Sequence, residues 1–384
     1  MPSRIRVAHV SSAHRASDAR IHLREAASLT TAGYDVMVIA VQSDSELPET
    51  GVRVIELRAR PRLQRATIGS LIAVWGAIRN RALIVHLHDP ELSWAIVPLR
   101  LLGRVVIFDA HEDLPVQMLG KPYVRRGTRG LARLASWLVV KMASRANHII
   151  AATDAISRRF PESKVSVVRN YPRIRGGDAE VVPILDRPPR VGYIGELSVR
   201  RGAFEMVDAV GAASFPADWD VVLAGSMSPD SLLANLMNRP GWDRVSFKGV
   251  LSPDDARDLL NECRVGLVVL QRSRAYLDSL PTKMFEYFAA GIPIIASDFP
   301  LWRSIVEPLD CGVLVDETSP DAIAAAIAQY ARDPELLARH GANALRAAHD
   351  ELNWATQEPI LLDAYAGIVE SLRSKRPQSL NRGS

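Results

Sequence analysis

The feature that most constrains the fold is a regular alternation of short apolar runs with longer helical patterns along nearly the whole chain. Such alternation is typical of parallel sheets whose strands are joined by helices. We therefore predict an α/β protein built from two doubly wound parallel sheets. The predicted strands are residues 4–12, 36–41, 52–57, 83–88, 105–109, 148–152, 165–168, 191–195, 221–224, 245–247, 265–270, 292–296 and 313–315. The main predicted helices of the first half are residues 18–32, 68–79, 91–102 and 123–144.

One segment interrupts the alternation. Residues 174–190 contain two Gly and three Pro and show no periodicity, so we interpret them as a linker. This divides the 384 residues into a first domain, 1–173, and a second domain, 191–352, both of ordinary size. We expect residues 353–374 to form a helix that crosses back to the first domain, and residues 375–384 to be disordered.

Composition excludes several classes of protein. An apolar share of 48% and a charged share of 23% describe an ordinary globular chain. The two cysteines, Cys263 and Cys311, provide neither a disulfide framework nor metal-ligand spacing, and we expect both to be buried thiols. No signal-peptide pattern and no apolar run of about 20 residues is present. We therefore expect a protein of the reducing cytoplasm.

Positive charge is concentrated in the first domain. Residues 1–173 hold 26 Lys and Arg against 14 Asp and Glu, whereas the remainder holds 21 against 29. The stretch 121–145 alone has seven cations, no acid and a helically spaced apolar stripe. A basic amphipathic helix of this kind can lie on an anionic membrane; alternatively, the stripe is domain core. Nucleic acid is disfavoured as a partner, because few aromatic side chains stand among the cations to stack bases.

The stretch from residue 278 to 298 indicates a ligand site in the second domain. It is predicted to form a loop, a helix that begins near Pro281 and ends at Gly291, and a buried strand. Lys283 lies in the first helical turn, and no Ser, Thr, Asp or Asn immediately precedes Pro281 to cap the free N–H groups. A cation beside uncapped amides favours a bound anion, usually phosphate. Glu286 can accept hydrogen bonds from a ribose, and Asp278 can meet sugar hydroxyls; the alternative is a solvated helix surface.

This stretch resembles the signature of glycosyltransferase family 4, in which two acidic residues are separated by seven others. Asp278 and Glu286 have that spacing, although the first position is usually Glu. The string P-T-K-x-F-E-Y-x-A-x-G-x-P further resembles a branch that builds surface polysaccharides. The resemblance implies a GT-B fold with a cleft between the domains and retaining, metal-independent sugar transfer. It also implies a first domain that binds the acceptor and a second domain that binds the nucleotide sugar.

The end of the first predicted strand is polar. No glycine occurs between residues 10 and 33, so a dinucleotide-binding G-x-G-x-x-G loop is absent there and NAD or FAD is not expected. Ser12, His14, Asp18 and Arg20 could instead contact the acceptor or the donor phosphates. Asp18 has a second interpretation as the cap of the helix that follows.

Two further strand ends in the first domain carry histidines. His86, His88 and Asp89 occur in the string HLHDPEL, and two same-face histidines on a strand suggest metal ligands at first sight. No other Cys or His joins them locally, so we expect no metal and interpret His88 and Asp89 as a polar strand end. His111, in the string DAHEDLP, resembles the family histidine that meets the donor sugar; a structural loop histidine is the alternative.

The first strand of the second domain leads into the string GELSVRRG. Family 4 enzymes often carry two cations here that hold the donor diphosphate. Gly195 and Gly202 match the glycines of this pattern, Arg201 occupies the second cation position, and Arg200 precedes it. Glu196 occupies the first cation position, and the resemblance to this branch implies that Lys283 replaces the missing charge. A solvated turn is the alternative. The Asp218–Asp220 pair precedes a strand at its amino end, and we interpret it as a turn and not as a metal-binding motif.

These observations predict a retaining hexosyltransferase that moves a sugar from a nucleotide donor, of the UDP-sugar type, to a lipid-linked or glycan acceptor in cell-surface polysaccharide synthesis. The expected catalytic residues are His111, Asp278, Arg201 and Lys283. No cofactor is expected. The expected location is the cytoplasmic face of the cell membrane, as a peripheral protein. A GT-B-fold epimerase or phosphorylase and a catalytically degenerate nucleotide-sugar-binding protein remain as alternatives, the latter because of the departures at Asp278 and Glu196.

Overall fold

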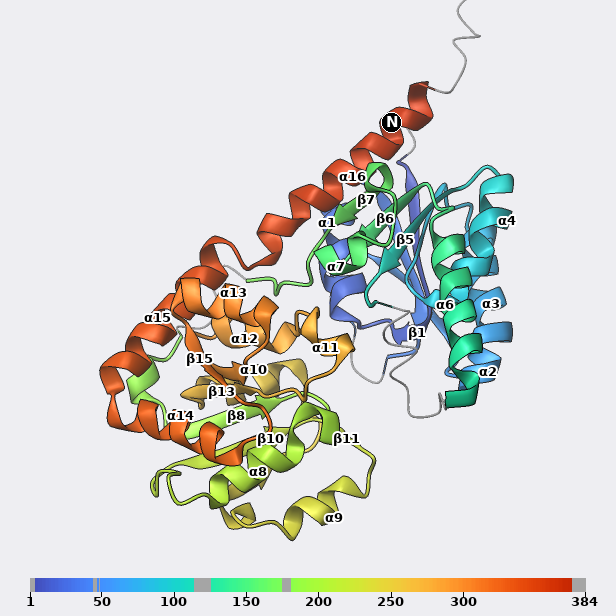
Figure 1. Cartoon of the computed structure of the whole chain (residues 1–384). Coiled ribbons are helices and arrows are strands. Elements are labelled where there is room, and N and C mark those ends of the chain that lie inside the picture. The colour runs from blue at the N-terminus through green and yellow to red at the C-terminus, as the bar shows by residue number, and fades with distance from the viewer. Residues whose placement is uncertain (1–3, 44–46, 48, 114–125, 175–180, 375–384) are drawn as a thin grey trace, which may run out of the picture. The chain divides into compact units, whose positions relative to one another are not determined.

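The structure is a computed structural model that describes residues 4–43, 47, 49–113, 126–174 and 181–374. The chain divides into two compact units (Figure 1). Unit 1 comprises Met1–Asn170 together with Trp354–Ser384, and unit 2 comprises Tyr171–Asn353. Each unit has its own sheet and its own buried core.

Unit 1 contains a seven-stranded parallel sheet in the order β3-β2-β1-β4-β5-β6-β7. Its strands are nearly continuous apolar runs because both faces are covered by helices. The predicted strands of this half are all present, with ends shifted by a few residues. They are β1 (Arg6–Arg15), β2 (Asp35–Val41), β3 (Arg53–Leu57), β4 (Ile84–Leu87), β5 (Val105–Ala110), β6 (His148–Ala151) and β7 (Val165–Val167).

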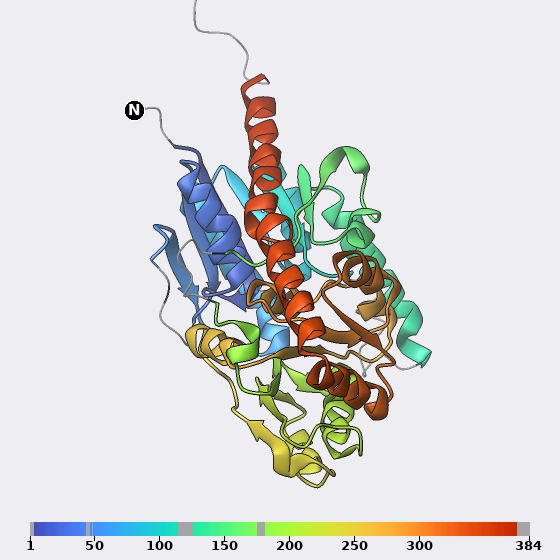
Figure 2. The same ribbon diagram turned by 90° about the vertical axis from the view of Figure 1, so that its left-hand side faces the viewer.

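Two helical layers cover this sheet. On one face lie α2 (Arg62–Gln64), η2 (Arg65–Gly69), α3 (Ser70–Arg79), η3 (Pro90–Ala95), α4 (Ile96–Leu101), η4 (Arg126–Thr128) and α6 (Arg129–Ala143), on the right in Figure 1. On the other face lie η1 (Ala19–Ala26), α1 (Ala27–Thr31) and α16 (Trp354–Ser374). Figure 2 shows α16 running beside η1 and α1. Short segments α7 (Asp154–Ser157) and η5 (Glu162–Lys164) connect β6 to β7.

The first helix differs from the prediction of a regular α-helix over residues 18–32. It begins as a π-helix, η1, before continuing as α1. Arg20 and Glu25 are five residues apart, which is the spacing that a π-helical hydrogen bond spans. Both side chains are buried. We attribute the wider turn to this requirement, because an α-helix would direct residues five apart toward different sides.

Unit 2 contains a six-stranded parallel sheet in the order β12-β10-β8-β13-β14-β15. The predicted strands are again present, and a two-stranded sheet of β9 (Leu197–Ser198) and β11 (Met227–Ser228) was not predicted. The main strands are β8 (Arg190–Ile194), β10 (Asp220–Ala224), β12 (Val245–Phe247), β13 (Val265–Val268), β14 (Ile294–Ser297) and β15 (Gly312–Val315).

The helices of unit 2 pack on both faces of its sheet. The longer ones are α8 (Ala203–Gly211), α9 (Leu232–Met237), α10 (Pro253–Asn261), α12 (Thr282–Ala289), α13 (Pro300–Leu309), α14 (Pro320–Arg332) and α15 (Pro334–Asp350). The shorter ones are η6 (Ile184–Asp186), η7 (Val199–Arg201), η8 (Trp242–Arg244) and α11 (Arg274–Leu277). Cys263 and Cys311 are buried free thiols, as predicted.

Strand order identifies one special position in each sheet. In unit 1 the chain passes from β1 to β2 on one side and later to β4 on the other. In unit 2 the neighbours of β8 are likewise β10 on one side and β13 on the other. The carboxyl ends of strands at such a switch point leave a crevice where open α/β sheets bind ligands. The β1–β4 and β8–β13 ends are therefore the places to examine for sites.

Several predictions lie partly or wholly outside the described residues. These are the tail 375–384, residues 175–180 of the predicted linker, and the start of the predicted helix 123–144. Among the described helices, none combines the length and hydropathy that crossing a bilayer requires.

Candidate functional site

In unit 2 the candidate site is centred on Lys283, in the first turn of α12. Its side chain is only 7% exposed, which contradicts a solvated helix surface at this residue. Its Nζ lies 3.4 Å from the centre of the Tyr193 ring and has no hydrogen-bond partner among the residues that the structure describes. No side chain caps the start of α12, where Pro281 occupies the N-cap position itself. Burial, together with the charge of Arg201, holds the pKa of Lys283 well below its usual value.

Glycine backbone encloses this lysine from the strand ends. Gly195 directly follows β8, and a Cβ on it would lie 3.0 Å from Lys283 Nζ. Gly225 directly follows β10 with φ +135°, and a Cβ there would come within 1.9 Å of the Gly195 carbonyl oxygen. Gly202 has φ +72°, and a Cβ there would lie 2.1 Å from the Val269 carbonyl oxygen. Side chains are therefore excluded at three points where loops meet at the β8–β13 switch point.

A pocket of about 260 Å³ opens beside the same glycines. It lies within unit 2, and its walls come from the ends of β8 and β10 and from the loop and helix after β12. The lining residues are Ile194, Gly195, Glu196, Ala224, Gly225, Ser226, Val250, Leu251 and Ala256. Gly195 thus separates a small, mainly apolar recess from the buried ammonium of Lys283.

The other predicted residues of unit 2 surround this point with different exposure. Arg201 is partly exposed, and its Nη2 lies 3.6 Å from Glu196 Oε2. Although burial opposes its charge, nearby Tyr193 and Glu196 raise the pKa of Arg201. Arg200 is exposed in the same turn. Glu286 and Asp278 are also exposed, on α12 and at the end of α11.

The predicted DWD turn is confirmed as a structural feature. Asp220 is the first residue of β10, and its carboxylate accepts two hydrogen bonds from Arg190 at 2.7 and 2.9 Å. It therefore lies at the amino end of the strand, on the edge of the sheet opposite Gly225.

In unit 1 the polar residues of the β1 and β4 ends form one network around Asp89. Its carboxylate accepts hydrogen bonds from the Ser11 hydroxyl at 2.8 Å and from the backbone N–H of Ser12 at 2.6 Å. His14 Nδ1 lies 3.0 Å from its other oxygen. Burial opposes ionisation, but these partners lower the pKa of Asp89 to about 2. Burial likewise opposes the charge of His14, yet Asp89 raises the pKa of His14 to about 9. This part of the site therefore presents a positively charged imidazole.

A second network lies beside it, at the end of β5. Asp109 is buried and accepts two hydrogen bonds from Arg20, both at 3.0 Å. His88 Nδ1 and His111 Nε2 lie 3.2 and 3.4 Å from Asp109 Oδ2. Burial, reinforced by the nearby cation of Arg20, lowers the pKa of His111 to about 3 despite the attraction of Asp109. His111 is therefore a neutral imidazole, and its side chain is 19% exposed.

The structure modifies the expected roles of three residues. Arg20 was expected to reach a ligand, but its guanidinium is 3% exposed and bonds to Asp109 and the Val168 carbonyl oxygen. It is an internal ion-pair group, since desolvating a guanidinium requires such partners. His88 and Asp89 are each 1% exposed, so they contact neighbouring side chains and not a ligand directly. The accessible imidazoles of the network are those of His14 and His111, whose ring centres are 5.3 Å apart.

The helix-cap interpretation of Asp18 is confirmed. Its Oδ1 accepts hydrogen bonds from the N–H groups of Arg20 and Ile21 at the start of η1. This satisfies two of the N–H groups that a helix start leaves free.

Sequence reasoning missed several members of the unit 1 network. His9 on β1 pairs in register with His86 on β4, which brings two imidazoles side by side. Glu25 of η1 and Tyr365 of α16 reach the same interior from helices. The available signal was a histidine within each of two predicted apolar strands, residues 4–12 and 83–88. Helix residues far away in the sequence gave no such signal.

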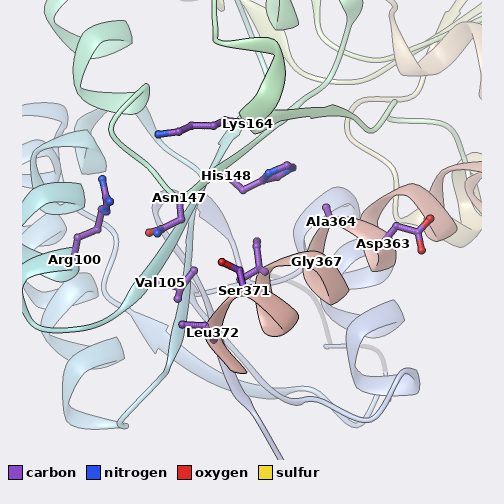
Figure 3. A pocket seen from close by; sticks show the side chains of 11 residues that line it. Arg100, Val105, Asn147, His148, Lys164, Asp363, Ala364, Gly367, Ser371 and Leu372 are labelled. Atoms are coloured by element: carbon purple, nitrogen blue, oxygen red, sulfur yellow. The ribbon is translucent and has the colours of Figure 1, made fainter. Parts of the chain in front are cut away.

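A larger pocket of unit 1 lies elsewhere. It has a volume of about 480 Å³ and is lined by Arg100, His148, Lys164 and Asp363, among others (Figure 3). Val105 and His148, at its wall, begin β5 and β6. It therefore opens at the amino ends of these strands, away from Asp89 and His111.

The apolar stripe of the basic helix is not core. On α6 the side chains that face the sheet are small, namely Ala132, Ser136 and Ala143. Large apolar side chains of the same helix are 45–70% exposed: Leu131, Leu134, Trp137 and Leu138. The alternative in which this stripe packs inside the domain is wrong for these residues.

Comparisons with known proteins agree with this architecture. A model described as "Glycosyl transferase 4-like domain" matches residues 19–172, and one described as "Glycosyl transferases group 1" matches residues 178–347. No curated protein sequence matches significantly. The chain resembles sucrose-phosphate synthase from Thermosynechococcus elongatus, at 19% identity and TM-score 0.73, over 97% of this chain and 100% of that one.

Two other solved structures share the fold. HepE of Anabaena in complex with UDP-glucose has 16% identity and TM-score 0.72, with 94% of this chain and 99% of that one covered. WaaG, a glycosyltransferase involved in lipopolysaccharide biosynthesis, has 13% identity and TM-score 0.69, with 93% and 98% covered. Likeness at this identity supports the fold, and the two family models together span most of the chain. The chain therefore belongs to the glycosyltransferase group 1 family, known as family 4, and has the GT-B fold.

Proposed function

We propose that the protein is a retaining glycosyltransferase that moves a hexose from a UDP-sugar to a lipid-linked or glycan acceptor in cell-surface polysaccharide synthesis. The observation that carries the proposal is the buried ammonium of Lys283, which has no hydrogen-bond partner and lies at an uncapped helix start. A buried cation without an anion is costly, and a helix start favours a phosphate. HepE, which has the same fold, was solved with UDP-glucose.

Each part of the donor has a corresponding place in this region of unit 2. The diphosphate would lie between Lys283, Arg201 and the start of α12, with exposed Arg200 nearby. The uracil would enter the recess beside Gly195 and Gly225, where backbone can approach a flat ring closely because no Cβ is present. The exposed carboxylate of Glu286, three residues along α12 from Lys283, would accept the hydrogen bonds of the ribose hydroxyls.

The reaction would break the bond between the anomeric carbon and the diphosphate oxygen. Lys283 and Arg201 would stabilise the negative charge that develops on the leaving UDP, without rearrangement during the step. The acceptor oxygen would form the new bond on the same face of the sugar, and its proton would pass to the departing phosphate. Within unit 2, Asp278 would hold a hydroxyl of the donor sugar. Within unit 1, the neutral imidazole of His111 would be available for a hydrogen bond to a sugar hydroxyl. We propose no metal ion for this step.

The acceptor side would be unit 1. His14 carries positive charge at the β1 end and is 37% exposed, so it can receive an anionic group such as the phosphate of a lipid-linked acceptor. Ser12 is held beside it by Asp89 and Glu91. The involvement of WaaG in lipopolysaccharide biosynthesis is consistent with this class of acceptor.

We further propose that unit 1 rests on an anionic membrane surface on the cytoplasmic side. Ten large apolar side chains of its α3–α4–α6 layer are exposed: Leu71, Ile72, Trp75, Val97, Leu101, Leu102, Leu131, Leu134, Trp137 and Leu138. Exposed large apolar side chains gathered on one helical layer are unusual on a face that meets only water. Residues 126–147 contain no acid, and exposed cations border the apolar side chains at Arg129, Arg133 and Lys141. Each such cation adds about 1 kcal/mol of attraction to anionic lipid.

Titration calorimetry with UDP tests the donor assignment. Glu286→Ala should weaken UDP binding about tenfold, because the ribose loses charge-assisted hydrogen bonds. It should weaken UMP binding equally, since both ligands carry the ribose. Glu335→Ala, an exposed acid in the first turn of α15, is the matched control and should leave UDP binding unchanged.

A second assay separates transfer from the alternatives. UDP release from UDP-glucose should require an acceptor such as a polyprenyl-diphosphate sugar. Release that never depends on acceptor, or conversion of the UDP-sugar without release, would indicate an epimerase or a hydrolytic activity. Wild-type UDP affinity in the Glu286→Ala variant would exclude the ribose contact.

A further inference from the structure

Unit 1 contains a group of ligand-type side chains whose arrangement the transfer reaction does not explain. His9 on β1, His86 on β4, His88 directly after β4, and Glu25 on η1 are each at most 1% exposed. We name these four residues the buried histidine cluster. We propose that the buried histidine cluster binds one divalent transition-metal ion, with Zn²⁺ as the expected ion. This goes beyond the proposed transfer reaction and does not depend on it.

The distances fit one ion. Each residue offers one nitrogen or oxygen atom, and the four atoms all lie within 4.8 Å of one another. His9 Nδ1 is 2.9 Å from His88 Nε2, and Glu25 Oε2 is 3.8 Å from Nδ1 of both His9 and His86. Ligands about 2.0–2.2 Å from a shared zinc ion lie roughly 3.3 Å apart in a tetrahedron. The observed distances lie on both sides of that value, so small side-chain rotations suffice.

The ligand types suit the same ion. Three imidazoles and one carboxylate form a donor set that zinc and its neighbours in the first transition row accept. Calcium and magnesium are disfavoured, because they select oxygen ligands.

Neighbouring side chains orient the imidazole rings in the way that hydrogen-bond partners orient metal-bound histidines. His88 directs Nδ1 to the Asp109 carboxylate at 3.2 Å, which leaves Nε2 as the lone-pair nitrogen facing His9. His86 Nδ1 lies 2.9 Å from the hydroxyl of Tyr365, which α16 supplies. The Asp109 carboxylate thus holds the His88 ring from behind, whereas the Tyr365 hydroxyl contacts the same His86 nitrogen that faces Glu25 and would give up this contact to the ion.

Unsatisfied polar atoms provide the independent observation. Among the described residues, both carboxylate oxygens of Glu25 are buried without a hydrogen-bond partner. Arg20 Nε lies 3.0 Å from Glu25 Oε1, but as an ion pair without hydrogen-bond geometry. Buried polar groups are nearly always paired in native proteins. A cation beside Oε2 would satisfy the side of the carboxylate that faces the imidazoles.

A neighbouring group with metal-type residues does not carry the same inference. His88, Asp109 and His111 also lie close together. There, however, Asp109 Oδ2 already lies within 3.4 Å of both ring nitrogens, and Arg20 neutralises the carboxylate. The charge and the hydrogen-bonding atoms of that group are therefore already paired by its own contacts.

The ion would have a positioning role. It would hold His88 Nε2, and through the opposite nitrogen of that ring it would hold Asp109 and His111. It would touch neither donor nor acceptor, because the four ligand residues are fully buried. Loading would accompany folding, when the ligands come together.

Metal content of the whole protein tests the proposal. The full chain is produced in zinc-supplemented medium and purified by a tag without histidine, so that no column metal is introduced. Elemental mass spectrometry should find one zinc ion per chain after dialysis against a weak chelator. Protein refolded with Co²⁺ should show the visible absorption bands of a nitrogen- and oxygen-ligated cobalt ion.

Substitutions of the cluster residues test which side chains bind the ion. Glu25→Gln and His9→Gln should each lose the bound zinc and the cobalt spectrum. His22→Gln is the matched control, because His22 is a buried histidine of η1 that bonds to Ala16 and Thr50 outside the cluster. It should keep one zinc ion. If the cluster variants do not fold, wild-type protein stripped of metal replaces them, and its Tm should rise with added Zn²⁺ but not with Mg²⁺.

Other results would overturn the proposal. Wild-type protein without stoichiometric metal, and with a Tm that Zn²⁺ does not change, would show that the cluster is a neutral, proton-sharing network. Zinc that persists in both cluster variants would place the ion elsewhere. Neither result would affect the UDP-binding test above, so the two proposals fail independently.

Discussion

Lys283 Nζ lies 3.4 Å from the centre of the Tyr193 ring, with the Gly195 backbone beside it and no hydrogen-bond partner. The ring face attracts the ammonium electrostatically but accepts no strong hydrogen bond. The ammonium is therefore held in place while its bonding capacity remains available to an anion. Because burial lowers the pKa of Lys283, its ammonium loses the proton at a lower pH than an ordinary lysine does.

UDP affinity should fall as pH rises, and the fall should begin below the ordinary lysine pKa of about 10.4. A bound diphosphate favours the charged amine, so binding takes up a proton wherever free Lys283 is neutral. Lys283→Met should bind UDP about ten- to a hundredfold more weakly at pH 7 and should lose this pH dependence. Calorimetry in buffers of different ionisation enthalpy measures the proton uptake directly. Equal pH profiles for wild type and Lys283→Met would contradict this role of the lysine.

The His14–Asp89 pair should make stability depend on pH. The pKa of His14 is about 9 in the folded protein, above the value of about 6.5 expected when unfolded. The pair's contribution is thus fully present below pH 6.5 and is lost as pH rises through 9. His14→Gln should be less stable than wild type at pH 6, and the difference should shrink by pH 10. Urea unfolding at each pH checks this. A constant difference would mean that His14 is not charged in the folded state.

Two glycine substitutions should have opposite effects on stability. Gly202→Ala places a Cβ against the Val269 carbonyl oxygen at a positive φ, which should lower the free energy of unfolding by about 2–4 kcal/mol. Gly130→Ala lies on α6 with nothing within 4 Å of the added Cβ and should raise it by up to about 1 kcal/mol. Both are measured by chemical denaturation. Equal stabilities would indicate that the turn at Gly202 can rearrange.

Membrane binding should depend on the exposed side chains of α6. Replacing Leu134 and Trp137 by Glu should lower the partition coefficient onto vesicles that contain phosphatidylglycerol at least tenfold, because apolar burial is lost and negative charge is added. Met237→Glu changes an equally exposed apolar residue on α9 of unit 2 and should have no effect. Co-sedimentation with vesicles at two salt concentrations provides the measurement. Binding that ignores anionic lipid content would reject the surface.

The fold was predictable because its evidence is local. Every main strand is visible in the sequence as a short apolar run. The end of the helix at Gly291 was predictable because glycine adopts φ +67° without strain. The two-residue strands β9 and β11 carry no comparable pattern. The π-helical start of the first helix escaped prediction because Arg20 and Glu25 are drawn inward by partners distant in sequence.

The sites were predictable only in part, for the same reason. Lys283 could be placed in a helical turn, but its burial depends on Tyr193 and Gly195, which arrive from another strand. The pairing of His9 with His86 depends on sheet register, which apolar runs do not specify. The stripe on α6 had two equal interpretations, because periodicity identifies a face and does not say what covers it.

Unit 1 is assembled from two separated stretches of chain, since the backbone leaves it at Asn170 and returns at Trp354. The returning helix completes an apolar layer with Leu361, Tyr365 and Val369. The hydroxyl of Tyr365 also contacts His86. In a chain synthesised from its N-terminus, that helix follows the whole of unit 2. Unit 2 can thus fold before unit 1 is complete, and a fragment that stops at residue 170 would lack one apolar wall of unit 1.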